Sequence, residues 1–138
     1  MMEALEYFEG AELPAAVWRE KYALRDKQDR PTEQNPDQMH RRLANEFARI
    51  EAKKFAKPYS ADYIYGLFKD FGQLIPQGSP MYAIGNPQYC SSSNCFVCEP
   101  PTDSYGGIMR TDEQLVQLSK RRGGVGTDIS AIRPDTLA

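Results

Sequence analysis

Residues 90–98 read CSSSNCFVC, residues 103–108 read DSYGGI and residues 121–129 read RRGGVGTDI, and these three segments decide the fold. They predict a strand, a helix and a second strand. A thiol falls on the first strand, an acidic residue opens the helix, and a glycine turn closes it. Such positions carry much of the chemistry of α/β proteins, so the expected fold class is α/β.

The first strand is predicted over residues 94–99, where an apolar run ends at two prolines. Asp103 or Ser104 can cap the following helix, which should run to about Arg121. The second strand is predicted over 125–132, parallel to the first because a helix separates them. Two parallel strands leave an open, apolar sheet edge, so we expect this chain to be part of a larger fold.

Length and composition narrow the class of protein. The chain has 138 residues, with 17 lysines and arginines against 19 aspartates and glutamates, and a net charge of -2. This length suffices for one domain with a core, and the charge balance gives no reason to expect nucleic acid or an anionic membrane as partner. The chain has neither an apolar run of membrane-spanning length nor a signal-peptide pattern at its start, so a soluble cytoplasmic protein is expected.

The N-terminal part is expected to be helical. A weak helical pattern covers 14–24, and the polar segment 25–34 reads as a connector. Asn35 can cap the next helix, with Pro36 at the first helical position and Gln38 completing a variant of the capping box. That helix carries one apolar stripe, formed by Met39, Leu43, Phe47 and Ile50.

Ser60 is expected to cap a further helix. Its apolar residues follow helical spacing, at Ile64, Leu67, Phe68 and Phe71. The segment after it is rich in glycine and proline, which argues against a helix, and residues 81–84 are a possible short strand. The predicted division is therefore a helical region at 1–75 and the start of an α/β domain at 76–138.

The three cysteines lie within nine positions; they are odd in number and too close together for a secreted disulfide framework. Cys95 and Cys98 form a C-x-x-C pair, typical of a redox site or half of a zinc site, but no second half follows. The lone His40 has no local ligand partner and is expected on the solvated surface, so no metal site is predicted. Residues three apart on a strand point to opposite faces, so Cys95 and Cys98 should not form a disulfide with each other. Thiol chemistry or three buried structural thiols remain as alternatives.

The glycines at 123–126 invite comparison with a phosphate-binding loop. They end a helix and lead into a strand, however, so no helix N-terminus would face the phosphate. A helix C-cap followed by a tight turn is the simpler interpretation. Likewise, helix capping alone can explain Asp103. Arg121 and Arg122 suit the negative end of the helix dipole without any ligand.

Taken together, these segments resemble one known family. Residues 93–97 (SNCFV), 103–104 (DS), 122–126 (RGGVG) and 132–134 (IRP) resemble the start of the barrel in the large catalytic subunit of ribonucleotide reductase. Ser79 followed by Pro80 fits the family's substrate-side serine or threonine. The resemblance is detailed over 79–134 and looser over the helical region, at residues 21–26 and 35–51.

The resemblance implies a ten-stranded α/β barrel, incomplete in this chain, that removes the ribose 2′-hydroxyl through a thiyl radical. Cys95 would be one of two reducing thiols, ending in a disulfide with a second cysteine farther along the chain. A thiol on a rigid strand stays close to the reacting carbon while the barrel excludes water. Ser79, Asn94 and Gly124 would line the substrate, although Asn94 stands where many relatives have serine.

The resemblance also implies an effector site for a deoxynucleotide that selects the substrate. Asp103, Ser104 and Arg133 match this site. A carboxylate can accept a hydrogen bond from a ribose hydroxyl, and an arginine can bind phosphate through two donors. In the family this site lies at a dimer interface that the helix after Ser104 helps form, so a homodimer of the completed subunit is expected.

The expected cofactor is a radical source, either adenosylcobalamin or a separate metal-containing radical subunit. The expected partners are a ribonucleotide substrate, a thioredoxin-like reductant and the remainder of the barrel, because the family's radical-bearing cysteine and shuttle thiols match nothing in this sequence. The short segment before Trp18 leaves no room for the activity-regulating domain of some relatives.

Three functional hypotheses follow. The chain can be the N-terminal piece of a split, interrupted or truncated reductase, inactive alone. It can instead be a non-catalytic remnant that binds nucleotide or associates with an intact reductase. The third alternative is an unrelated structural domain.

Overall fold

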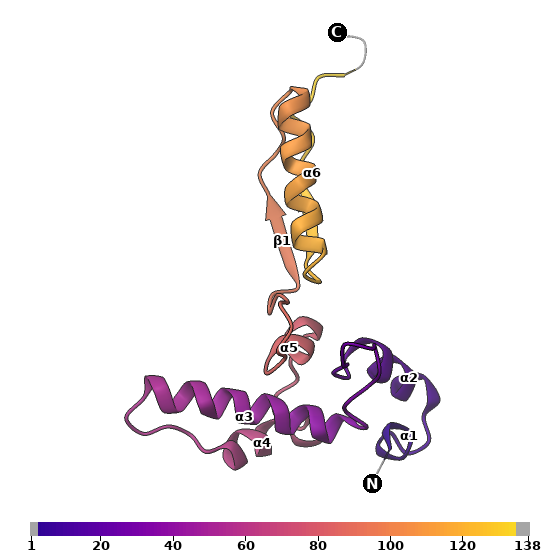
Figure 1. Ribbon diagram of the computed structural model, residues 1–138, viewed down its shortest axis with the longest axis vertical. Coiled ribbons are helices and arrows are strands. Elements are labelled where there is room, and N and C mark those ends of the chain that lie inside the picture. The colour runs from indigo at the N-terminus through magenta and orange to yellow at the C-terminus, as the bar shows by residue number, and fades with distance from the viewer. Residues whose placement is uncertain (1–2, 135–138) are drawn as a thin grey trace. The chain divides into compact units, whose positions relative to one another are not determined.

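The computed structural model describes residues 3–134 and divides into two compact units, Met1–Gln88 and Tyr89–Ala138. The first unit contains six helical elements among the described residues: α1 (Ala4–Tyr7), α2 (Glu12–Lys21), α3 (Pro36–Lys54), α4 (Ala61–Phe68), the 3-10 helix η1 (Lys69–Phe71) and α5 (Gly78–Ala83). The second contains β1 (Cys95–Cys98), α6 (Tyr105–Ser119) and β2 (Gly124–Thr127) (Figure 1). Met81 and Ile84 pack against the core of the first unit.

The longest helix, α3, begins where the capping residues predict. Asn35 Oδ1 accepts a hydrogen bond from Gln38 N at 3.1 Å, and Pro36 occupies the first helical position. The Gln38 side chain also reaches back and accepts from Gln34 N at 2.8 Å. The predicted apolar stripe is confirmed at Met39 and Leu43, which are fully buried at the centre of the core.

The second predicted helix, α4, packs against α3 in the first unit (Figure 1). Ser60 caps it as expected, because its hydroxyl accepts from Tyr63 N at 3.2 Å. Ile64 and Phe68, one helical turn apart, are buried in the core shared with α3. The apolar spacing of the sequence therefore identified the packed faces of both helices.

The prediction of a solvated His40 is wrong. His40 is fully buried in α3, and its ring lies 4.6 Å from that of Phe71 and 6.4 Å from that of Phe68. Within the described residues neither ring nitrogen has a hydrogen-bond partner. Burial lowers the pKa of His40, although the carboxylates of Asp37, Asp70 and Glu33 oppose that shift. His40 follows Met39 directly, so a wider apolar face than the predicted stripe includes it.

The prediction of a strand at residues 81–84 is also wrong, because the segment belongs to the short helix α5. Pro80 is tolerated there as the third helical residue, where the missing N–H would have no intrahelical acceptor. Arg42 of α3 donates to the carbonyl oxygens of Met81, at 2.9 Å, and of Ile84. It also pairs with Glu33 at 2.7 Å, with both side chains about one-tenth exposed. This buried network ties α5 to α3.

The second unit contains a two-stranded parallel sheet and α6. Cys95 pairs with Gly124 and Cys98 with Thr127, which confirms the predicted parallel arrangement. Both strands are shorter than predicted, with four residues each. The first is not buried as expected, because Val97 is 90% exposed. In the part of the chain that the structure describes, no further strand extends this sheet.

The turn between α6 and β2 ends the helix in a Schellman arrangement. Gly123 N donates to Leu118 O at 3.1 Å, and Arg122 N donates to Ser119 O at 2.9 Å. The left-handed residue is Arg122, with φ of 66°, and not a glycine as a C-cap would suggest. Gly123 is needed for a different reason, since a Cβ there would lie 2.6 Å from the Phe96 ring.

No helix within residues 3–134 is long and apolar enough to cross a membrane.

Candidate functional site

One end of the sheet brings together three of the predicted substrate-site residues. Gly124 N donates to the carbonyl oxygen of Asn94 at 2.7 Å, and Gly124 is the strand partner of Cys95. The Cys95 side chain is exposed. On the face that carries Cys95 and Val97, the partner residues on β2 are Gly124 and Gly126. The Cys95 thiol therefore lies beside a glycine strip, Gly124 and Gly126, that has no side chains on this face. The glycine strip leaves room for a ligand next to the thiol.

Ser79, the fourth predicted substrate-site residue, is buried on α5 in the first unit. The structure thus groups Asn94, Cys95 and Gly124 in one unit and places Ser79 in the other.

The three cysteines differ in exposure. All are free thiols, which confirms that Cys95 and Cys98 do not bond each other. Cys98 is buried and Cys90 is half-buried, so the alternative of three buried structural thiols is wrong for Cys95. Chemical access is the property that separates Cys95 from the other two.

The predicted effector residues also lie together. Arg133 Nε donates to Asp103 Oδ2 at 2.6 Å, in a partly exposed ion pair. Ser104 caps α6, because its hydroxyl accepts from Gly107 N at 3.1 Å, and Asp103 is thereby left to pair with arginine. A pocket of about 490 Å³ is lined by both members of the pair and by Ser104, Tyr105 and Ile108.

Tyr105 and Ile108 were not among the predicted site residues. Ile108 lies one helical turn after the Ser104 cap, so helical spacing from the cap could have identified it as a wall of this pocket.

As predicted, the glycine segment at 123–126 does not form a phosphate-binding loop at a helix N-terminus. It follows the C-terminal end of α6, where carbonyl oxygens and the negative dipole end lie. Arg121 donates to Gln117 O at 2.7 Å, so its guanidinium binds a carbonyl of the last helical turns. The interpretation of Arg121 as a partner of the helix end is confirmed.

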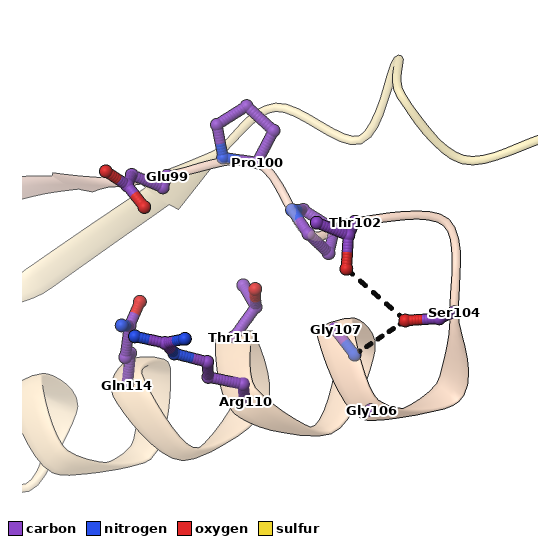
Figure 2. Close-up of a pocket in the computed structure, with 10 residues that line it drawn as sticks. Glu99, Pro100, Thr102, Ser104, Gly106, Gly107, Arg110, Thr111 and Gln114 are labelled. Carbon is purple, nitrogen blue, oxygen red and sulfur yellow. Dashed lines mark hydrogen bonds between the residues drawn. The ribbon is translucent and has the colours of Figure 1, made fainter.

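A second pocket, missed by the sequence reasoning, lies between residues 99–102 and the first turns of α6 (Figure 2). Its wall includes Thr111, which is only 7% exposed. Gly107 allows the close approach of the two walls, because a Cβ there would lie 2.1 Å from Thr102 Oγ1. Thr111 lies one helical turn from both Ile108 and Leu115, so a polar residue between two apolar ones on the same helix face was the signal in the sequence.

Residues 3–134 contain no group of three or more histidine, cysteine, aspartate or glutamate side chains that could hold a metal ion.

Residues 93–137 match the ribonucleotide reductase barrel domain, and the matched segment includes β1, α6 and β2. No curated protein matches the chain. The family match confirms the resemblance of this segment to the ribonucleotide reductase barrel, which its cysteine, aspartate and glycine motifs predicted.

Proposed function

From the relationship of residues 93–137 to the ribonucleotide reductase barrel domain, we propose that this chain is the N-terminal portion of a reductase catalytic subunit. Further strands would continue the β1–β2 sheet into the ten-stranded barrel and cover the exposed Val97. The completed subunit reduces ribonucleotides to deoxyribonucleotides, and the chain alone is inactive. The family match carries this proposal.

In this role Cys95 is one of two reducing thiols. The 2′-hydroxyl leaves the ribose as water, and two thiols supply two electrons and two protons as they join in a disulfide. The partner of Cys95 is a cysteine in the rest of the barrel, and a thioredoxin-like reductant later reduces the disulfide. The exposed Cys95 beside Gly124 and Gly126 supports this role, with Asn94 and Gly124 lining the substrate.

The pocket at Asp103 is the proposed effector site. Asp103 accepts from the ribose hydroxyl of a deoxynucleotide, and Arg133 binds phosphate, with Ser104 between them. The pairing of Asp103 with Arg133 supports this proposal, since a preformed pair holds both groups in place before the ligand arrives. The completed subunit acts as a cytoplasmic homodimer.

The radical source is supplied from outside the described residues. Either adenosylcobalamin or a separate metal-containing radical subunit would supply the radical chemistry that the reaction needs.

Co-expression tests the proposal. This chain, tagged, is produced together with the reading frame that encodes the next barrel strands. Ribonucleotide reduction is assayed with adenosylcobalamin, with a metal-containing radical subunit, and with neither. Co-purification with activity supports a catalytic subunit in two pieces, and the cobalamin dependence identifies the radical source. A complex that forms but shows no reduction with either radical source contradicts it.

A second candidate function is nucleotide binding without catalysis. The observation in its favour is that Asp103, Ser104 and Arg133 line one pocket. A remnant of this kind binds deoxynucleotides alone or associates with an intact reductase. Tight deoxynucleotide binding by the chain, without any complementing polypeptide, would favour this candidate.

A further inference from the structure

We infer that the pocket beside the first turns of α6 binds a small oxyanion, namely a phosphate or carboxylate group carried on a small molecule. The pocket has a volume of about 340 Å³, within the range of small-molecule sites. It lies between residues 99–102 and α6, and Figure 2 shows its lining. The inference does not depend on the proposed reductase role.

Thr111 supplies the first argument. The residue is 7% exposed, and its side chain forms no hydrogen bond with any residue in the described part of the chain. Figure 2 shows its side chain rising from α6 toward the 99–102 segment. The polar side chain of so largely buried a residue usually has a hydrogen-bond partner. An oxygen of a bound anion would accept the hydrogen bond that this hydroxyl can donate.

Arg110 and Gln114 supply the second argument. They lie one helical turn apart on α6, and both line the pocket beside Thr111 (Figure 2). No ion pair or hydrogen bond joins either side chain to another residue within 3–134. A guanidinium offers a planar set of donors that suits phosphate and carboxylate, and a glutamine amide adds two more. Three neighbouring side chains therefore present unused donors.

Gly106 supplies the third argument. A Cβ at Gly106 would meet nothing within 4 Å, so packing does not require glycine here, whereas it does at Gly107. Glycine weakens a helix relative to alanine. Its bare backbone in the first turn of α6 leaves an N–H group open to a ligand, at the helix end that favours negative charge.

Glu99 lies on the opposite wall and distinguishes an oxyanion from other ligands. Its carboxylate repels an anion, so Glu99→Gln should strengthen the binding of one. A ligand with an ammonium group would instead use Glu99 and bind less well to this variant.

The test is a titration of the full chain with inorganic phosphate, followed by two-dimensional amide NMR, with chloride at matched ionic strength as control. We expect saturable shifts at the amides of residues 105–111. Thr111→Val should weaken phosphate binding about tenfold, as expected for a lost hydrogen bond to a charged group, and Thr111→Ser should restore it. Arg110→Gln should weaken it at least as much, and Glu99→Gln should strengthen it severalfold.

Lys120→Gln is the matched control, because it removes one exposed positive charge from the C-terminal end of α6. It should leave phosphate binding unchanged. Three results would overturn the inference: no saturable shift in the pocket, equal binding by Thr111→Val and the native chain, or equal losses in Lys120→Gln and Arg110→Gln. The native spectrum outside the pocket shows whether each variant is folded.

Discussion

Arg133 Nε lies 2.6 Å from Asp103 Oδ2, joining the residue before the α6 cap to a residue beyond β2. Both side chains are partly exposed, so the pair contributes little to stability, on the order of 1 kcal/mol or less. The ion pair matters because of where it places the two side chains. The two groups that the family resemblance assigns to an effector lie on the same pocket, one as acceptor and one as donor.

Asp103→Asn should therefore affect binding more than folding. We expect deoxynucleotide affinity to fall about tenfold, because a charged acceptor becomes neutral and Arg133 loses its partner. Isothermal calorimetry of the completed reductase with deoxynucleotides measures the affinity, and urea unfolding measures the stability. Asp112→Asn, on the exposed side of α6, is the control and should change neither. Equal affinities of Asp103→Asn and the native chain would remove Asp103 from the effector site.

Cys95 should be both the most reactive thiol and the essential one. Iodoacetamide should modify Cys95 in the native chain faster than Cys98, because Cys95 is exposed and Cys98 is buried. In a completed reductase, Cys95→Ser should abolish multiple turnover and leave effector binding intact, and Cys90→Ser should retain turnover. Mass spectrometry locates the modified cysteine. Sustained turnover by Cys95→Ser would exclude its role as a reducing thiol.

Gly123→Ala should destabilise the second unit by about 1–3 kcal/mol, because its Cβ would strike the Phe96 ring and force the core to shift. Gly126→Ala is the control, since a Cβ at Gly126 meets nothing within 4 Å. Urea denaturation followed by NMR signals of β1 and β2 compares the two. A difference below about 0.5 kcal/mol between them would show that the turn can relax around the new methyl group.

Stability should depend on pH through His40. Because burial lowers the pKa of His40 below its ordinary value of 6.5, the unfolded chain takes up the proton first as the pH falls. The free energy of unfolding is then at its full value above pH 6.5 and decreases below it, by up to about 1.4 kcal/mol per pH unit for one proton. His40→Leu should lack this component. Parallel slopes for the two proteins between pH 7.5 and 5.5, in urea unfolding, would contradict the assignment.

Local chemistry predicted the helix starts well. Asn35, Ser60 and Ser104 each cap a helix through a side-chain oxygen, because capping depends only on residues within one turn. The parallel pairing of β1 and β2 also followed from the sequence, since a connecting helix constrains the direction of the return strand. Cys95 could then be placed on the first of two neighbouring strands, but the pairing register could not, and Gly124, expected in the turn, is the first residue of β2.

Contacts between distant segments determined features of the fold that the sequence alone did not predict. His40 is polar by composition, yet Phe68 and Phe71 from another segment enclose it. The helix α5 forms in a segment rich in proline and glycine, where Arg42 holds the carbonyl oxygens of Met81 and Ile84. The contact between Asp103 and Arg133 could be expected only from the family resemblance, because no local pattern links residues so far apart in sequence.

The pairing of Cys95 with Gly124, and of Val97 with Gly126, has a thermodynamic consequence for any molecule that settles against the thiol. Glycine has no rotamers to immobilise, so a ligand that lies along this part of β2 orders no side chain there. The entropic penalty that usually accompanies the closing of side chains around a ligand, about 0.5–1.5 kcal/mol for each immobilised flexible side chain, does not arise along this strip. The surface beside the sulfur is as rigid as the main chain itself, and the position of a bound molecule is then set by backbone geometry.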